Sequence, residues 1–294
     1  MRNFVTGLTL LAMALGTAFG ATIHVPGDQP TIQAGIDAAV DGDTVLIADG
    51  TYTGEGNKNI SPLGKAITIQ SANGPETCII DCESSDRAFH INQGEGSDTV
   101  IQGLKITNGY IMGSDEGGAV KILGSSPTFH NCHFENNRIE SGQCHGGAVG
   151  AMNSMAVFTD CVFQANSAAD EGGALYVKNQ SQVTVTNCQF LDNDAYEGGA
   201  VYLENETSGH FTNTEFSGND ALSGGAVFVE SSAPVFHQCL FSENTAETGG
   251  ALYLTINANP IIGGGEGLGN AFFNNNASDG VDLYFIKTGE TPVN

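Results

Sequence analysis

Carboxylate side chains recur at one position relative to a repeated glycine pair. Glu116, Glu171 and Glu197 each directly precede a Gly-Gly dipeptide, and Asp170 precedes Glu171. If residues one interval apart stack on each other, carboxylates lie close enough to share a cation or to raise one pKa. No cofactor is required, but Ca²⁺, a hard cation with oxygen ligands, suits these four predicted metal ligands. The alternative is a solvated acidic edge without an ion.

Two catalytic chemistries use overlapping residues. Stacked Glu171 and Glu197 resemble the carboxyl pair of retaining glycosidases, which stand ~5–5.5 Å apart. A lyase needs a base, and Arg138 and His145 lie in the longest interval between glycine pairs. A uniform ladder of acids does not distinguish an acid from a nucleophile, and a strongly acidic surface repels polyuronates. The catalytic candidates are therefore Arg138, His145, Glu171 and Glu197, while a non-enzymatic role is favoured.

Aromatic residues also recur at one outward position of four successive repeats: Tyr176, Tyr202, Phe228 and Tyr253. An exposed row of such rings is expected to stack sugar rings or to meet a partner protein. These four are the predicted ligand-binding residues. The alternative is that aromatic residues on a sheet face support one another by cross-strand contact.

Two sequence motifs repeat at the same interval, and they determine where these acidic and aromatic residues are placed. Gly-Gly-Ala followed by Val or Leu begins at Gly117, Gly146, Gly172, Gly198, Gly224 and Gly249, at intervals of 25 to 29 residues. Phe-x-x-Asn begins at Phe134, Phe163, Phe190, Phe216, Phe241 and Phe272. Self-similarity at such a period indicates a stacked solenoid.

The residues after each glycine pair alternate between apolar and polar or aromatic, as in Leu175 to Lys178. Alternation with β-branched residues favours strands over helices. Each repeat is therefore one coil of a parallel β-helix, with inward Phe and Cys side chains stacked along the axis. The Asn is expected at a left-handed or bridging bend, with amides bonded from coil to coil, and the glycine pair at a sharp corner.

The fold class predicted is all-β: a single-stranded right-handed parallel β-helix solenoid with an N-terminal capping helix. Residues 1–20 are predicted to be a signal peptide, because an apolar run follows Arg2 and small residues flank a cleavage site. The β-helix spans 21–286, with an N-terminal cap at 21–50, a helix between Pro30 and Val40, and regular coils at 117–280. A polar tail occupies 287–294.

The paired motifs resemble the repeats of the polymorphic outer membrane protein family, which are secreted surface β-helices. The segment Ile23-His24-Val25-Pro26, with Gln29 to Ala34, Asp41 to Val45 and Gly50-Thr51-Tyr52, resembles the N-terminal opening of right-handed β-helix proteins of the pectate-lyase-like superfamily. The resemblance implies right-handedness. It does not imply one function, because this architecture carries lyases, hydrolases and adhesins.

The charge and composition of the chain limit the classes of binding partner that can be expected. The chain of 294 residues has 33 acidic and 9 basic residues, and its net charge of −24 disfavours nucleic acid and anionic lipid. The partners expected are an extracellular polysaccharide or a surface protein, without membrane insertion of the mature chain, in a secreted, periplasmic or cell-surface location. The predicted function is a non-catalytic carbohydrate-binding or adhesion-type module. The alternative is a polysaccharide lyase or glycoside hydrolase acting along a groove, and a structural spacer ranks third.

Overall fold

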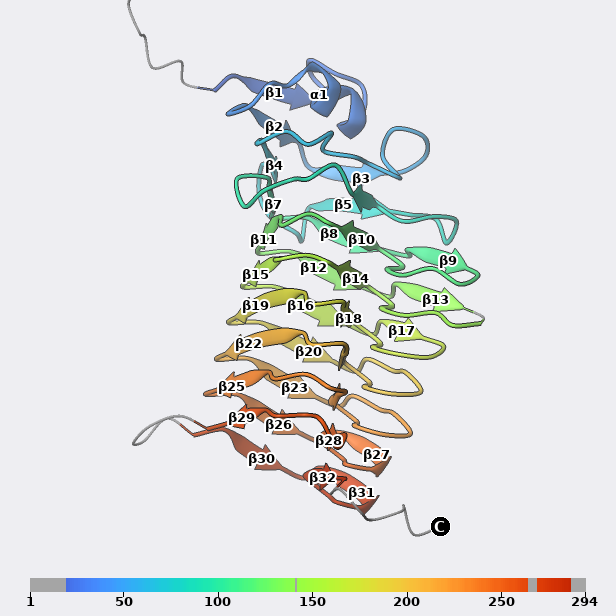
Figure 1. Ribbon diagram of the computed structural model, residues 1–294. Helices are drawn as coiled ribbons and strands as arrows, with labels where there is room; N and C mark the ends of the chain where they lie inside the picture. Colours follow the sequence, from blue (N-terminus) through green and yellow to red (C-terminus); the bar gives the residue numbers. More distant parts are fainter. Residues whose placement is uncertain (1–19, 141, 264–268, 287–294) are drawn as a thin grey trace, which may run out of the picture.

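The chain winds into a right-handed parallel β-helix, as the repeats predict (Figure 1). The computed structural model describes residues 20–140, 142–263 and 269–286. Successive coils stack along one axis, so the two ends of the described chain lie at opposite ends of the stack. The predicted signal peptide, apart from Gly20, and the polar tail lie outside the described residues.

Three long parallel sheets form the walls of the solenoid, and a coil contributes one strand to each. The ten-stranded sheet contains β1 (Thr22–Val25), β2 (Thr44–Ile47), β4 (Thr68–Ser71), β7 (Val100–Gln102), β11 (Thr128–His130), β15 (Val157–Thr159), β19 (Gln182–Thr186), β22 (Ser208–Thr212), β25 (Val235–His237) and β29 (Ile261–Ile262). The nine-stranded sheet contains β3 (Gly50–Tyr52), β5 (Cys78–Asp81), β8 (Lys105–Thr107), β12 (His133–Glu135), β16 (Val162–Gln164), β20 (Gln189–Leu191), β23 (Glu215–Ser217), β26 (Leu240–Ser242) and β30 (Ala271–Phe273). The eight-stranded sheet contains β6 (Phe89–Ile91), β10 (Val120–Leu123), β14 (Val149–Met152), β18 (Leu175–Lys178), β21 (Val201–Leu203), β24 (Val227–Val229), β28 (Leu252–Leu254) and β32 (Leu283–Phe285).

A row of loops projects from one side of the stack and carries two small sheets, on the right in Figure 1. The three-stranded one contains β9 (Tyr110–Met112), β13 (Arg138–Glu140) and β17 (Ser167–Ala168). The two-stranded one contains β27 (Thr245–Thr248) and β31 (Asn276–Asp279). These loops connect the nine-stranded sheet to the eight-stranded sheet, and those that carry β9, β13, β17 and β27 each end at a glycine pair.

Stacked phenylalanines fill the core, as predicted. Phe190 pairs with Phe216 in register, and their ring centroids are 5.0 Å apart with nearly parallel planes. A second stack, which includes Phe211 and Phe236 at 5.0 Å, contacts the first edge-on. Cysteines of the motif, among them Cys188, are buried free thiols in the same core. Apart from buried asparagines, the interior is therefore largely apolar.

Buried asparagine amides link the coils, also as predicted. Asn193 Nδ2 donates to the carbonyl of Phe163 at 3.0 Å and to Asn219 Oδ1 at 2.9 Å. Its Oδ1 accepts from both the backbone N and Nδ2 of Asn166 at 3.0 Å. The prediction of a left-handed bend at this Asn is wrong by one residue, because Asp192 has the positive φ of 55°. The ladder amides face inward because the preceding residue makes the turn.

The two glycines of each pair serve different purposes. Gly172 has a φ of 64°, a conformation that disfavours other residues. A Cβ on Gly173 would lie 2.1 Å from the carbonyl oxygen of Gly199 in the next coil. The first glycine therefore makes the predicted corner, and the second allows two coils to approach.

The single helix of the described residues is α1 (Ile32–Ala38), inside the predicted range. The Thr31 hydroxyl accepts from the backbone N of Ala34 at 3.2 Å, which satisfies a helix N-terminal donor. The helix packs on β1 and β2, where Gly35 meets Val25 and Val45. Its role as a cap for the solenoid end stays a prediction.

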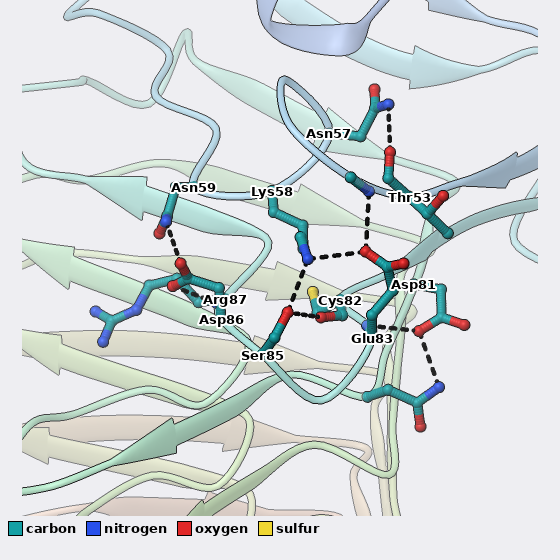
Figure 2. A network of polar contacts seen from close by, with 12 residues as sticks. Thr53, Asn57, Lys58, Asn59, Asp81, Cys82, Glu83, Ser85, Asp86 and Arg87 are labelled. Carbon is teal, nitrogen blue, oxygen red and sulfur yellow. Dashed lines mark hydrogen bonds and ion pairs between the residues drawn. The ribbon is translucent and has the colours of Figure 1, made fainter.

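Polar contacts join two irregular loops of the N-terminal coils (Figure 2). Lys58 Nζ lies 2.8 Å from both Glu83 Oε2 and Ser85 Oγ. Asn59 donates to Asp86 in the neighbouring loop. Because these groups satisfy one another, we interpret this network as structural.

Candidate functional site

The residues before the glycine pairs form one column along the solenoid. Glu116, His145, Glu171 and Glu197 are joined by successive parallel β-bridges, immediately before the strands of the eight-stranded sheet. All four are intermediate in burial. The structure therefore brings three of the four predicted catalytic candidates, namely His145, Glu171 and Glu197, into one line of neighbours.

Within this column, His145, Asp170 and Glu171 converge. One potential ligand atom of each lies within 4.8 Å of those of the other two. His145 Nδ1 is 3.0 Å from Glu171 Oε2. The imidazole stacks on the Tyr176 ring, with 4.5 Å between centroids. The tyrosine thereby orients the histidine toward the acids.

Glu116 differs from the other predicted metal ligands because two lysines neutralise it. Its carboxylate lies 2.9 Å from Lys121 Nζ and 3.5 Å from Lys178 Nζ. By contrast, the ion pairs of the described residues include no Lys or Arg partner for Asp170, Glu171 or Glu197. Negative charge is therefore uncompensated only from Asp170 onward along the column.

This uncompensated charge changes the ionisation of Glu197. Burial, followed by repulsion from Glu171, Asp170 and Glu230, raises the pKa of Glu197 to about 7. Burial and Glu171 also raise the pKa of Asp170, although His145 opposes this effect. Glu197 can therefore hold a proton near neutral pH.

The raised pKa of Glu197 predicts how the stability of the chain depends on pH when a chelator keeps metal ions away. Because the pKa of Glu197 in the folded chain lies above its ordinary value of 4.5, the free energy of unfolding falls as pH rises from about 4.5 to about 7. Glu197→Gln should therefore be more stable than wild type at pH 8 and lose this advantage at pH 4. Urea unfolding at both pH values measures the difference. The control is Glu247→Gln at an exposed position, which should change the free energy of unfolding by the same small amount at both pH values. If Glu197→Gln also had the same effect at both pH values, the raised pKa of Glu197 would be contradicted.

The four predicted ligand-binding aromatics stack as one column, but they are not exposed. Tyr176, Tyr202 and Phe228 are only 1, 2 and 5 % exposed, and Tyr253 is partly buried. Tyr202 and Phe228 stack at 4.8 Å, and the two buried tyrosine hydroxyls donate to Glu204 and Glu230.

The expectation of an exposed aromatic strip is therefore wrong. The glycine corners lie against the outer face of the strands that carry these rings. A Cβ on Gly172 would lie 3.3 Å from Tyr176 Cα of its own coil, and a Cβ on Gly198 would lie 3.2 Å from Phe228 Cβ of the next coil. The column is a second, smaller apolar core outside the solenoid wall.

Arg138 is placed apart from the other catalytic candidates. It lies in β13 of the projecting loops, where its exposed guanidinium pairs with Glu140. A cavity of 330 Å³ adjoins it, lined partly by Ser167, Asp194 and Tyr196. Because its charge is already paired, Arg138 has no unmatched charge to offer a substrate.

A polar groove that the sequence interpretation missed lies at the other ends of the same strands. We call it the carboxamide groove; it has a volume of 710 Å³ and is lined by Asn153, Asn179, Gln180, Asn205, Glu206, Ser231 and Asn257. These residues come from the turns after β14, β18, β21, β24 and β28. A signal was present, because an Asn or Ser follows each of these strands within three residues.

The turns themselves direct these side chains outward. Asn179 and Gln180 both have positive φ, as do Asn205 and Glu206 in the next coil. Asn tolerates this conformation better than most residues. The backbone N of Gln180 donates to the carbonyl of Asn205, which fixes adjacent turns at the coil spacing. Side-chain amides are thus presented at regular steps.

Comparison with known proteins agrees with the architecture. Residues 172–285 match the sequence model of the right handed beta helix region, and residues 160–178 match that of the Chlamydia polymorphic membrane protein repeat. The resemblance to these two kinds of β-helix is thereby confirmed. No curated protein sequence matches the chain.

Solved structures with similar coordinates are all distant in sequence. A pectin methylesterase from carrot is 12% identical with a TM-score of 0.42, covering 94% of this chain and 90% of that chain. A mannuronic acid specific polysaccharide family 6 lyase from human gut microbiota is 14% identical with a TM-score of 0.40, covering 81% and 67%. An alginate lyase is 14% identical with a TM-score of 0.38, covering 86% and 63%. Among the described residues, no helix has the length and hydropathy needed to cross a membrane.

Proposed function

We propose that this chain is a secreted or cell-surface β-helix protein that binds a neutral extracellular polysaccharide without cleaving it. The carboxamide groove is the observation that carries the proposal. Its lining comes from five successive coils, whose spacing of ~4.8 Å suits repeated contacts with an extended polymer. Amide side chains both donate and accept hydrogen bonds, as recognition of sugar hydroxyls requires.

Charge supports a neutral ligand over an acidic one. The net charge of −24 repels polyuronates over the whole surface, and the single ionisable side chain in the groove lining is Glu206. The match to the polymorphic membrane protein repeat supports a surface location. The proposed export signal is residues 1–20.

A groove-directed variant tests this function. Asn179→Gly with Asn205→Gly removes two amides but keeps positive φ accessible, so the turns should persist. We expect affinity for the bound glycan to fall roughly tenfold, since each lost hydrogen bond contributes about 0.5–1.5 kcal/mol. The measurement is binding to an array of neutral glucans, mannans and xylans beside pectin and alginate, followed by titration of the polysaccharide retained.

The matched control is Asn136→Gly with Asn274→Gly, because both residues have positive φ and lie outside the groove. It should bind like wild type. Retention of pectin or alginate alone, or equal affinity of the groove variant and the control, would contradict the proposal. Assays for new reducing ends and for unsaturated products should detect no cleavage.

A glycoside hydrolase is the second candidate, and one observation favours it. The protonated form of Glu197 beside the carboxylate of Glu171 is an arrangement suited to a general acid and a nucleophile. New reducing ends that disappear in both Glu197→Gln and Glu171→Gln would favour this function over simple binding.

A further inference from the structure

The convergence of His145, Asp170 and Glu171 has features that a solvated acidic edge does not explain. The Nδ1 atom of His145 is buried and has no hydrogen-bond partner among the described residues. It nevertheless lies 3.0 Å from Glu171 Oε2, in a geometry that makes an ion-pair distance but no hydrogen bond. The Nδ1 and Oε2 atoms are thus held close together without a hydrogen bond between them.

This separation matches a shared metal ion. Two ligand atoms that each lie ~2.1 Å from a metal are ~3.0 Å apart at a ligand–metal–ligand angle of ~90° and ~3.4 Å apart at the tetrahedral angle. A small opening of the His145–Glu171 pair would therefore reach the tetrahedral geometry that zinc prefers. An oxygen of Asp170 completes a set of three atoms that all lie within 4.8 Å of one another. Asp170 and Glu171 are consecutive, and His145 comes from the preceding coil, so an ion would link two coils.

The surroundings supply rigidity and a need for positive charge. Stacking on Tyr176 restrains the imidazole. Lys121 and Lys178 pair with Glu116, further along the column, whereas the described ion pairs of Asp170 and Glu171 include no lysine or arginine. The whole column lies at the opposite ends of the strands from the carboxamide groove, so this site is independent of the proposed function.

We propose that His145, Asp170 and Glu171 bind one divalent transition-metal ion, with Zn²⁺ as the best match. Imidazole nitrogen with two carboxylates is a ligand set for zinc, whereas Ca²⁺ takes oxygen ligands alone. The predicted calcium ligands are thereby revised: His145 joins Asp170 and Glu171, whereas Glu116, whose charge the two lysines already satisfy, and Glu197, which lies outside the converging group, are left out. Three protein ligands leave coordination positions for water.

Calorimetric titration of the chelator-treated full chain with Zn²⁺ tests the site. Wild type should bind one ion per chain, and Zn²⁺ should raise its melting temperature. His145→Ala and Glu171→Gln should each weaken this binding more than about 100-fold, since even outer-shell losses weaken metal sites about 10–100-fold. Co²⁺ should give visible absorption bands in wild type that His145→Ala lacks.

Two matched controls should bind Zn²⁺ like wild type. His210→Ala removes an exposed histidine, and Glu247→Gln alters an exposed acid two residues before a glycine pair, the position that Asp170 occupies. Melting temperatures measured in the presence of a chelator establish that each variant is folded. If His145→Ala does not fold, the isosteric Glu171→Gln still tests the site. Absence of Zn²⁺ binding, equal affinity in all variants, or Ca²⁺ binding as tight as Zn²⁺ and unaffected by His145→Ala would each overturn the proposal.

Discussion

Gly173→Ala should lower the free energy of unfolding by roughly 3–5 kcal/mol, at or above the usual cost of overpacking a core. The added Cβ would lie 2.1 Å from the carbonyl oxygen of Gly199 and 2.5 Å from that of Asp194. Both are backbone atoms within hydrogen-bonded coils, so neither moves without separating two coils. The φ of Gly173 is not in the left-handed range, so the effect is one of space alone.

Urea unfolding of Gly173→Ala and Gly96→Ala side by side measures this effect. An added Cβ at Gly96 meets no heavy atom within 4 Å, and its φ is also outside the left-handed range. Gly96→Ala should therefore be neutral or stabilise by about 0.4–1 kcal/mol through the unfolded state. If the two variants differ by less than about 1 kcal/mol, a neighbouring coil does not lie this close.

Asn193→Leu should destabilise the chain by about 4 kcal/mol, although the two side chains are similar in size. The amide of Asn193 is the acceptor for both donors of Asn166 and a donor to the carbonyl of Phe163. Leucine leaves the buried backbone N of Asn166 without its acceptor, and it removes one partner each from the carbonyl of Phe163 and from Asn166 Nδ2, which keeps its bond to the carbonyl of Phe134. Each unsatisfied buried group costs about 1–3 kcal/mol.

Asn259→Leu is the control, because Asn259 is exposed and has no positive φ. It should change stability by less than about 0.5 kcal/mol in the same urea experiment. A similar small change for Asn193→Leu would show that the ladder contributes little beyond packing. If the slope of unfolding free energy against urea concentration is unchanged in both variants, the two measurements concern the same unfolding transition.

The two proposed sites divide the outer surface of the eight-stranded sheet between them. The corner before each strand gathers acids and His145, whereas the turn after each strand presents amides. Because a solenoid repeats each position at every coil, one substitution per repeat changes the chemistry of a whole column. The change from Glu116 to His145 to Glu171 is such a variation.

Amino-acid patterns alone determined the solenoid, its register and its core. The alternation of Leu175 to Lys178, the spacing of the Phe-x-x-Asn motifs and the repeated glycine pair are each local, and six repetitions leave one stacking arrangement. The corner at the first glycine of each pair was predictable because glycine adopts positive φ more readily than other residues. The coil-to-coil amide bonds of Asn193 followed from the same register.

Only the tertiary structure decided what covers each outward position. Alternation placed Tyr176 and Tyr202 outside the wall, but side chains of neighbouring coils cover Tyr176, among them His145 and Glu204, and no local pattern encodes these contacts. Which acid meets a lysine and which meets His145 likewise depends on side-chain directions between coils. The carboxamide groove is concave because paired left-handed turns shape it, and burial and concavity are properties of packed surfaces rather than of spacing along a chain.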